Sequence, residues 1–275
     1  MKKLYKILAL ILVAIAVKGQ GKTASFISYD ITCTYQLTFR PDSTSPGPKI
    51  EMFYLFINNE QSLFKSKNKY LRDSALLVAD GSMAGRQNSL SFLRQHPTEF
   101  NFSIVKNSCK EVKTTDLIYH DYFSYAEPPD HLQWILSQDT ARISGYSCQM
   151  ATTEFGGRKW TAWFTETIPV NDGPYKFCGL PGVIVRLTDS RAHYDFLLHE
   201  LKQTPRVVPQ ANTLKTFETS KATFFKKQRE YNENPIGIAE QSGVVFTSGR
   251  SEIAQRAQEK IKANNNPIEF FPVEH

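Results

Sequence analysis

The chain has 275 residues, and 33 lysines and arginines against 27 aspartates and glutamates give it a formal net charge of +6 at pH 7. Four of the positive charges are lysines within residues 1–19, so the remainder of the chain carries only +2. A chain this nearly balanced lacks the basic patch that nucleic-acid binding requires. Its length suffices for one large domain or two small ones.

The first nineteen residues have the order of a secretory signal peptide. Lys2, Lys3 and Lys6 precede an apolar run over residues 7–17, and Lys18-Gly19 follows it. This run is much shorter than the roughly twenty residues that a membrane-spanning helix needs. We therefore expect a signal peptide over 1–19 that is cleaved after Gly19. The remainder would be exported, to the periplasm or the outer membrane, with no transmembrane span.

Apolar and polar side chains alternate strictly over residues 29–40, which predicts a half-buried strand. A loop rich in Pro and Ser at 41–48 leads to a second strand over 50–57, so we expect a long hairpin. Residues 62–98 give a weaker signal. There we expect a short helix over 70–78 followed by a loop, and the sequence does not decide whether this whole stretch is ordered.

Further segments typical of strands lie over 100–106, 117–125, 131–137, 144–155, 159–167, 182–189 and 193–201. Because few helical segments separate them, an antiparallel meander is the natural arrangement. After residue 205, apolar side chains recur at helical spacing over 217–231 and again over 253–261, which predicts two amphipathic helices.

The expected fold is therefore mainly β with C-terminal helices, built on a curved antiparallel sheet or an open half-barrel. We expect a β domain over 20–205 and a C-terminal helical extension over 206–275 that packs on the same domain.

A stretch rich in Gly and Pro, residues 173–184, is the strongest local motif, and we name it the signature segment. Gly and Pro fix backbone shape and bring no nucleophile, base or metal ligand. Residues 171–174 predict a turn, and 179–182 predict a bend where another backbone or a large side chain comes close. Two interpretations stay open: a corner of the curved sheet, or a loop that contacts a ligand.

Together with the runs Trp134–Thr140, Ile143–Thr153 and Gly157–Phe164, this segment resembles the GLPGLI family of secreted bacterial proteins. Val183 replaces the second leucine of the family name, and the resemblance covers roughly residues 27–200. It implies a protein found mainly in Bacteroidota, exported to the envelope and often encoded near TonB-dependent outer-membrane receptors. The family has no established activity, so no catalytic residue is carried over. The strand pattern is also similar to the half-barrels of lipoprotein-carrier proteins, at the level of fold alone.

Four residues in this region are candidate ligand-binding residues. Trp160 and Trp163 are three apart and face opposite sides of a strand, so the one outside the core would be available to a ligand. Arg158 either forms a salt bridge inside the fold or receives a ligand carboxylate. Tyr175, within the signature segment, is the fourth.

Four cysteines allow three full pairings, and the sequence alone does not choose among them. Cys148 and Cys178 both lie in the region that resembles the family, so we expect a bridge between them and a second between Cys33 and Cys109. The alternative is that the thiols are reduced or paired otherwise, and Cys33 would equally suit a buried apolar position. Export would allow disulfides to persist.

No cofactor or metal is indicated, because the chain has no CxxC, no HExxH and no Cys/His cluster with ligand spacing. His120-Asp121, Asp130-His131, His193 and His199 lie in no recognised nucleophile motif. We therefore expect a non-enzymatic protein that binds an apolar or peptide-like ligand, or a TonB-dependent receptor, on the concave face of its sheet. An envelope hydrolase with an unrecognised site and a purely structural interaction module are the alternatives.

Overall fold

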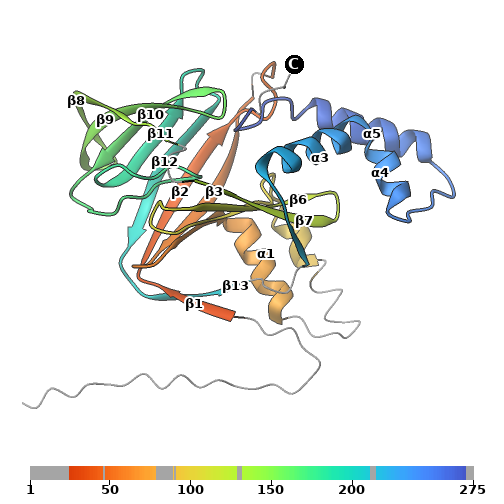
Figure 1. The fold of residues 1–275 in the computed structure, drawn as a ribbon, viewed down its shortest axis with the longest axis horizontal. Helices are drawn as coiled ribbons and strands as arrows, with labels where there is room; N and C mark the ends of the chain where they lie inside the picture. The colour runs from red at the N-terminus through yellow and green to blue at the C-terminus, as the bar shows by residue number, and fades with distance from the viewer. Residues whose placement is uncertain are drawn as a thin grey trace, which may run out of the picture.

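A computed structural model describes residues 25–45, 47–78, 89, 91–128, 132–210 and 215–270. The expected signal peptide over 1–19 lies outside these residues. Most of the described chain forms one twelve-stranded sheet in the order β14-β7-β6-β5-β4-β3-β2-β12-β11-β10-β9-β8. Figure 1 shows that this sheet is strongly curved and open. The expected fold class, mainly β on a curved antiparallel sheet with C-terminal helices, is confirmed.

Six consecutive strands form the first arm of the sheet. They are β2 (Ile31–Phe39), β3 (Lys49–Ile57), β4 (Ser62–Ser66), β5 (Ser103–Lys106), β6 (Val112–Ile118) and β7 (Asp121–Glu127). Each strand is antiparallel to the one before it. In β2 the apolar residues from Cys33 to Phe39 are buried and the polar residues between them are half-buried, as the alternation predicted. The hairpin formed by β2 and β3 is also confirmed.

Five further strands form the second arm. They are β8 (Ile135–Ile143), β9 (Tyr146–Phe155), β10 (Arg158–Thr165), β11 (Val183–Asp189) and β12 (Tyr194–Lys202). The last of these, β12, pairs antiparallel with β2 and joins the two arms. The chain therefore builds outward from β2 to β7, crosses to the opposite edge at β8 and returns to the middle of the sheet.

Three short strands lie at the margins. β1 (Ser25–Tyr29) pairs with β13 (Arg206–Gln210) in a separate ribbon, and β14 (Thr216–Glu218) adds to the sheet edge parallel to β7. The strand predicted over 29–40 is interrupted at Asp30, and the one predicted over 117–125 is the hairpin of β6 and β7. Tyr119 in that hairpin turn has a positive φ of 58°, a conformation that strand periodicity does not reveal. The domain boundary at 205 stays a prediction.

The helices cover opposite faces of the first arm (Figure 1). On one side lies α1 (Lys67–Val78), which begins three residues before the predicted helix. On the other side lies α3 (Lys221–Glu233), which contacts β6 and β7, while α4 (Pro235–Gln241) packs on α3 and α5 (Arg250–Lys262) packs on α4. The spacing of apolar residues predicted no helix over 235–241, although Asn234 caps α4 and Pro235 opens it. Of the helices in the described part of the chain, none is long and apolar enough to cross a membrane.

We name the face of the first arm that α3 covers the inner face, and the face that α1 covers the outer face. Side chains alternate between them, so on β7 the ring of Tyr125 packs against Phe224 of α3, whereas the ring of Tyr122 lies under Lys69 of α1. The largest apolar cluster lies on the inner side and takes residues from both arms. The core is therefore inside the curve of the sheet.

Candidate functional site

The signature segment, residues 173–184, crosses the inside of the sheet between its two arms. Its Phe177 is fully buried, with its ring centre 4.9 Å from that of Trp160 on β10. A Cβ atom at Gly182 would lie 2.1 Å from the carbonyl oxygen of Thr165, so a larger residue has no room there. Gly179 has a φ of 92°, which glycine adopts without strain. The predicted bend with a close backbone approach is thus present.

Backbone carbonyls of an irregular buried segment need donors, because an unpaired buried carbonyl is costly. Lys106, on β5 in the first arm, donates hydrogen bonds to these carbonyls. Its Nζ donates to the carbonyl oxygens of Gly173 at 2.6 Å, Tyr175 at 3.1 Å and Phe177 at 3.4 Å. It also forms an ion pair with Asp172 at 2.5 Å. Burial lowers the pKa of Lys106, and the charge of Asp172 opposes part of that shift.

Lys176, in the middle of the signature segment, is fully buried within a second set of charges. Its Nζ lies 2.5 Å from a carboxylate oxygen of Glu127 on β7 and 2.7 Å from one of Glu269. Lys221 of α3 pairs with the same two carboxylates. Burial raises the pKa of Glu269, but the two ammonium groups outweigh this effect and hold the pKa below its usual value. We name Glu127, Lys176, Lys221 and Glu269 the charge cluster.

A disulfide between Cys109 and Cys178, whose Cα atoms are 6.1 Å apart, ties the turn between β5 and β6 to the signature segment. The predicted pairings, Cys148 with Cys178 and Cys33 with Cys109, are therefore wrong. Cys33 and Cys148 are buried free thiols. They lie on β2 and β9, which three other strands separate, so they cannot bridge to each other either.

Arg158, a candidate for binding a ligand carboxylate, lies buried among partners from its own chain. Its guanidinium donates to Asp189 at 2.9 Å and to the side chain of Asn266 at 2.7 Å, and it lies 4.6 Å from the centre of the Phe270 ring. It also donates to the carbonyl oxygens of residues 267 and 268. Arg158 thus holds the C-terminal segment, residues 263–270, against the second arm.

The other three candidates do not converge on one site. Trp160 is 1% exposed within the core, whereas Trp163 faces the opposite side of β10 and is half-buried. Tyr175 is buried, and its hydroxyl donates to Glu269 at 3.0 Å. Of the four candidate residues, only Tyr175 lines the cavity that lies beside the signature segment.

The histidines do not assemble into a catalytic group among the described residues. The ring of His120 contacts that of Tyr119 at the tip of the β6–β7 hairpin, tilted by 46°, and His193 lies beside Asn266 with 3.3 Å between Nδ1 and Oδ1. Asp130 and His131 lie outside the described residues. In the part of the chain that the structure describes, no three His, Cys, Asp or Glu side chains gather as metal ligands would.

A cavity of about 370 Å³ lies between the inner face of the first arm, the signature segment and helices α3 and α5. We name it the aromatic cavity. Eight aromatic side chains line it: Phe39, Phe100, Phe102, Tyr125, Tyr175, Tyr194, Phe224 and Phe225. Its size falls within the range of roughly 300–1,000 Å³ that small-molecule sites occupy, and its mixture of aromatic walls with a few polar groups is typical of them.

Asp116 of β6 contributes an acidic group to the aromatic cavity. Among the described residues its carboxylate forms no ion pair and accepts one hydrogen bond, from the N–H of Leu117 at 2.7 Å. Burial raises the pKa of Asp116 to about 6, although the Leu117 hydrogen bond and the charges of two lysines oppose the shift. A buried carboxylate without a cationic partner can accept one from a ligand. No sequence motif had indicated this residue.

The chain is similar to a family of unknown function and to two solved structures. Residues 156–186 match a family described as a protein of unknown function (Porph_ging), a stretch that includes Arg158, Trp160 and the signature segment. No curated protein matches the chain. Two structures of PNGF-II, in space groups C2 and P21, are similar over 74% of this chain, each with a TM-score of 0.50 and with 12% and 13% sequence identity.

The chain spans about a third of the length of these PNGF-II structures, since the similarity covers 33% of each of them. At so low an identity the likeness concerns the fold alone. The chain therefore shares its signature region with a family of unknown function and its fold with part of PNGF-II.

Proposed function

We propose that the protein is an exported, non-enzymatic binding protein that holds an apolar or peptide-like ligand in the aromatic cavity. The observation that carries this proposal is the combination of eight aromatic walls with one carboxylate, Asp116, that has no ion pair among the described residues. The Cys109–Cys178 disulfide fits a protein that folds outside the cytosol.

The cavity suggests what the ligand carries. Its aromatic walls favour an apolar group, and Asp116 favours a positively charged amine nearby. Burying about 150 Å² of one phenyl ring contributes about 4 kcal/mol, and a charge-assisted hydrogen bond adds about 2 kcal/mol. Association entropy opposes both contributions, so a ligand with a single ring should bind only weakly.

Phenylalaninamide is a suitable probe because it has one ring, one free amine and no carboxylate. Calorimetric titration at pH 7.5 should show that it binds the protein about tenfold more tightly than N-acetyl-phenylalaninamide, which lacks the charge. Asp116→Asn should remove this preference while leaving binding of the acetylated probe unchanged. Equal affinities for both probes in the unaltered protein would show that Asp116 does not select a cation.

A pair of variants on α3 tests the location of the site. Gln228 lines the aromatic cavity and is half-buried, whereas the neighbouring Arg229 is exposed. Gln228→Trp should fill the cavity and abolish binding of both probes, and Arg229→Trp should bind them as the unaltered protein does. If Gln228→Trp folds and binds phenylalaninamide normally, the ligand does not occupy this cavity.

The family and the partner form a second part of the proposal. The resemblance of residues 134–184 to the GLPGLI family supports membership, and the match over 156–186 to a family of unknown function is compatible with it. Membership would make a TonB-dependent outer-membrane receptor the candidate partner. Crosslinking in the native envelope followed by mass spectrometry should recover such a receptor; recovery of unrelated proteins alone would count against this partner.

A further inference from the structure

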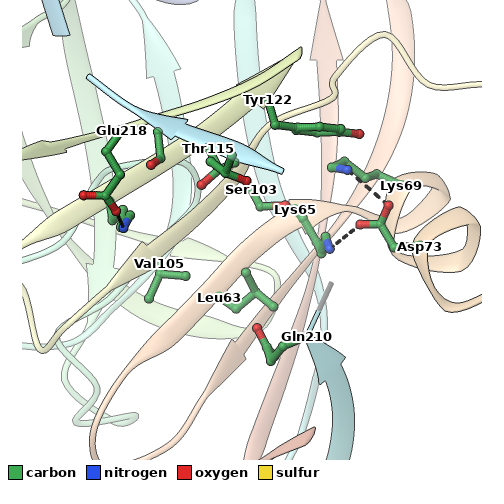
Figure 2. Close-up of a pocket in the computed structure, with 13 residues that line it drawn as sticks. Leu63, Lys65, Lys69, Asp73, Ser103, Val105, Thr115, Tyr122, Gln210 and Glu218 are labelled. Carbon is green, nitrogen blue, oxygen red and sulfur yellow. Dashed lines mark hydrogen bonds and ion pairs between the residues drawn. The ribbon is translucent and has the colours of Figure 1, made fainter. Parts of the chain in front are cut away.

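A second hollow, of about 460 Å³, lies on the outer face of the first arm, and we name it the outer groove. It is bounded by α1, by strands β4 to β7 and by residues of β13 and β14. Figure 2 shows Lys65, Lys69 and Asp73 gathered at one side of it and Glu218 at the other. The sheet separates this groove from the aromatic cavity, so the proposed function does not use it.

The outer groove contains more positive than negative charge. Asp73 is shared by two lysines, with Lys65 Nζ at 2.7 Å and Lys69 Nζ at 3.2 Å, and the lysine side chains are only 6% and 7% exposed. Burial lowers the pKa of Lys65, and Asp73 opposes that shift. The remaining charges, Lys113 and Glu218, pair with each other at the rim. Three lysines and two acids line the groove among the described residues, so the lining carries one excess positive charge.

Hydroxyl groups line the same groove as the two lysines. Ser103, Thr115 and Ser124 project from three adjacent strands into the groove lining. Ser124 is 2% exposed, and its hydroxyl has no hydrogen-bond partner among the described residues. The ring of Tyr122 lies 5.2 Å from Lys69 Nζ and keeps that ammonium group beside the groove. Hydroxyl donors next to a buried, undercompensated lysine pair are the groups that an oxyanion requires.

We propose that the outer groove binds a small polar ligand through a single oxyanion group, a carboxylate, sulfate or phosphate, held between Lys65, Lys69 and the neighbouring hydroxyls. The anion supplies the charge that Asp73 alone does not. It completes the coordination of both ammonium groups and gives the hydroxyl of Ser124 an acceptor. This site lies on the opposite face of the sheet from the aromatic cavity.

Inorganic phosphate is the probe, and broadening of its ³¹P resonance at pH 7.5 and low salt is the measurement. The unaltered protein should broaden the resonance saturably. Lys69→Met removes the excess charge and leaves the Lys65–Asp73 pair intact, so it should fold normally and bind phosphate at least tenfold more weakly. The matched control is Lys159→Met on β10, where the lysine is 76% exposed and pairs with Glu154; it should bind as the unaltered protein does.

A second variant keeps the test decisive. Asp73→Asn raises the excess charge of the groove and should tighten phosphate binding several-fold, opposite to Lys69→Met. Competition by sulfate and by acetate identifies which oxyanion the groove prefers. Equal broadening by Lys69→Met and the unaltered protein, or no saturable broadening by the unaltered protein, would overturn the proposal.

Discussion

Replacing Lys176 by methionine should lower the free energy of unfolding by about 3–5 kcal/mol, the cost of breaking a buried ion pair by removing one partner. The side chain is fully buried, and its Nζ lies 2.5 and 2.7 Å from oxygens of Glu127 and Glu269. Methionine fills most of the same volume, so little of the loss would come from a cavity. After the substitution, the buried carboxylates of Glu127 and Glu269 keep Lys221 as the one remaining lysine of the charge cluster.

Urea unfolding at pH 7 measures this loss as a lower transition midpoint at an unchanged slope. The control is Lys159→Met, because Lys159 and Glu154 form an exposed pair and exposed pairs contribute little. Combining Lys176→Met with Glu269→Gln removes one of the two carboxylates and should recover at least half of the loss. A free energy of unfolding for Lys176→Met within about 1 kcal/mol of the unaltered protein's, below the range for a broken buried pair, would show that this ion pair does not stabilise the fold. A double variant no more stable than the single one would show the same.

Three further changes test other parts of the structure. Gly182→Ala places a Cβ atom against the carbonyl of Thr165 and should destabilise the fold by about 3 kcal/mol in urea, through the steric clash of that atom with the Thr165 backbone; an unchanged midpoint would contradict the close approach. Asp116 stays protonated in the folded state up to about pH 6, against a usual pKa of 3.8, so stability should fall as pH rises from about 4 to 6. Asp116→Asn should abolish that slope and stabilise the protein by about 3 kcal/mol at pH 7.5, and a slope that persists would refute the assignment. Replacing Cys109 and Cys178 by serine opens a bridge between residues 69 apart and should cost about 4 kcal/mol; full stability of the double variant would mean that the bridge does not constrain the unfolded chain.

Local patterns in the sequence predicted most of the strands. The alternation of apolar and polar residues along β2 indicates that one face of the strand is buried, because a strand places successive side chains on opposite faces. The bend at Gly182 was also predictable from local sequence, because a glycine that follows a proline and precedes a β-branched run is typical of a bend at the start of a strand. Phe217 was misread as helical because a few apolar residues fit either period, and the pairing of β14 with β7 decided the outcome.

The contacts that hold the signature segment and the C-terminal segment were not predictable from local patterns. Lys176 pairs with a carboxylate 93 residues away, and Arg158 donates to a side chain 108 residues away, both in the C-terminal segment. That segment showed only the Asn- and Pro-rich composition of a helix stop. The disulfide was missed for a related reason: Cys109 reaches Cys178 because the signature segment crosses the sheet, a path that spacing along the chain does not reveal.

The role of Asp116 in the candidate site was not predictable from the sequence either. An aspartate among threonines and a leucine in a short strand suggests a solvent-facing position. Only the docking of α3 and the C-terminal segment over β6 and β7 turns that position into the wall of an aromatic cavity. Tertiary packing thus forms the candidate site, whereas the signature segment beside it could be recognised from the sequence.

Hydrogen–deuterium exchange with and without phenylalaninamide distinguishes a signature segment that is a structural element beside the binding site from one that is itself the binding loop. We expect amides of residues 173–184 to exchange only on global unfolding, in the free and the bound protein alike. Residues 98–102 and 222–230, which border the aromatic cavity, should gain protection when the probe binds. Rapid exchange of residues 173–184 in the free protein that slows on binding would instead make the signature segment the binding loop.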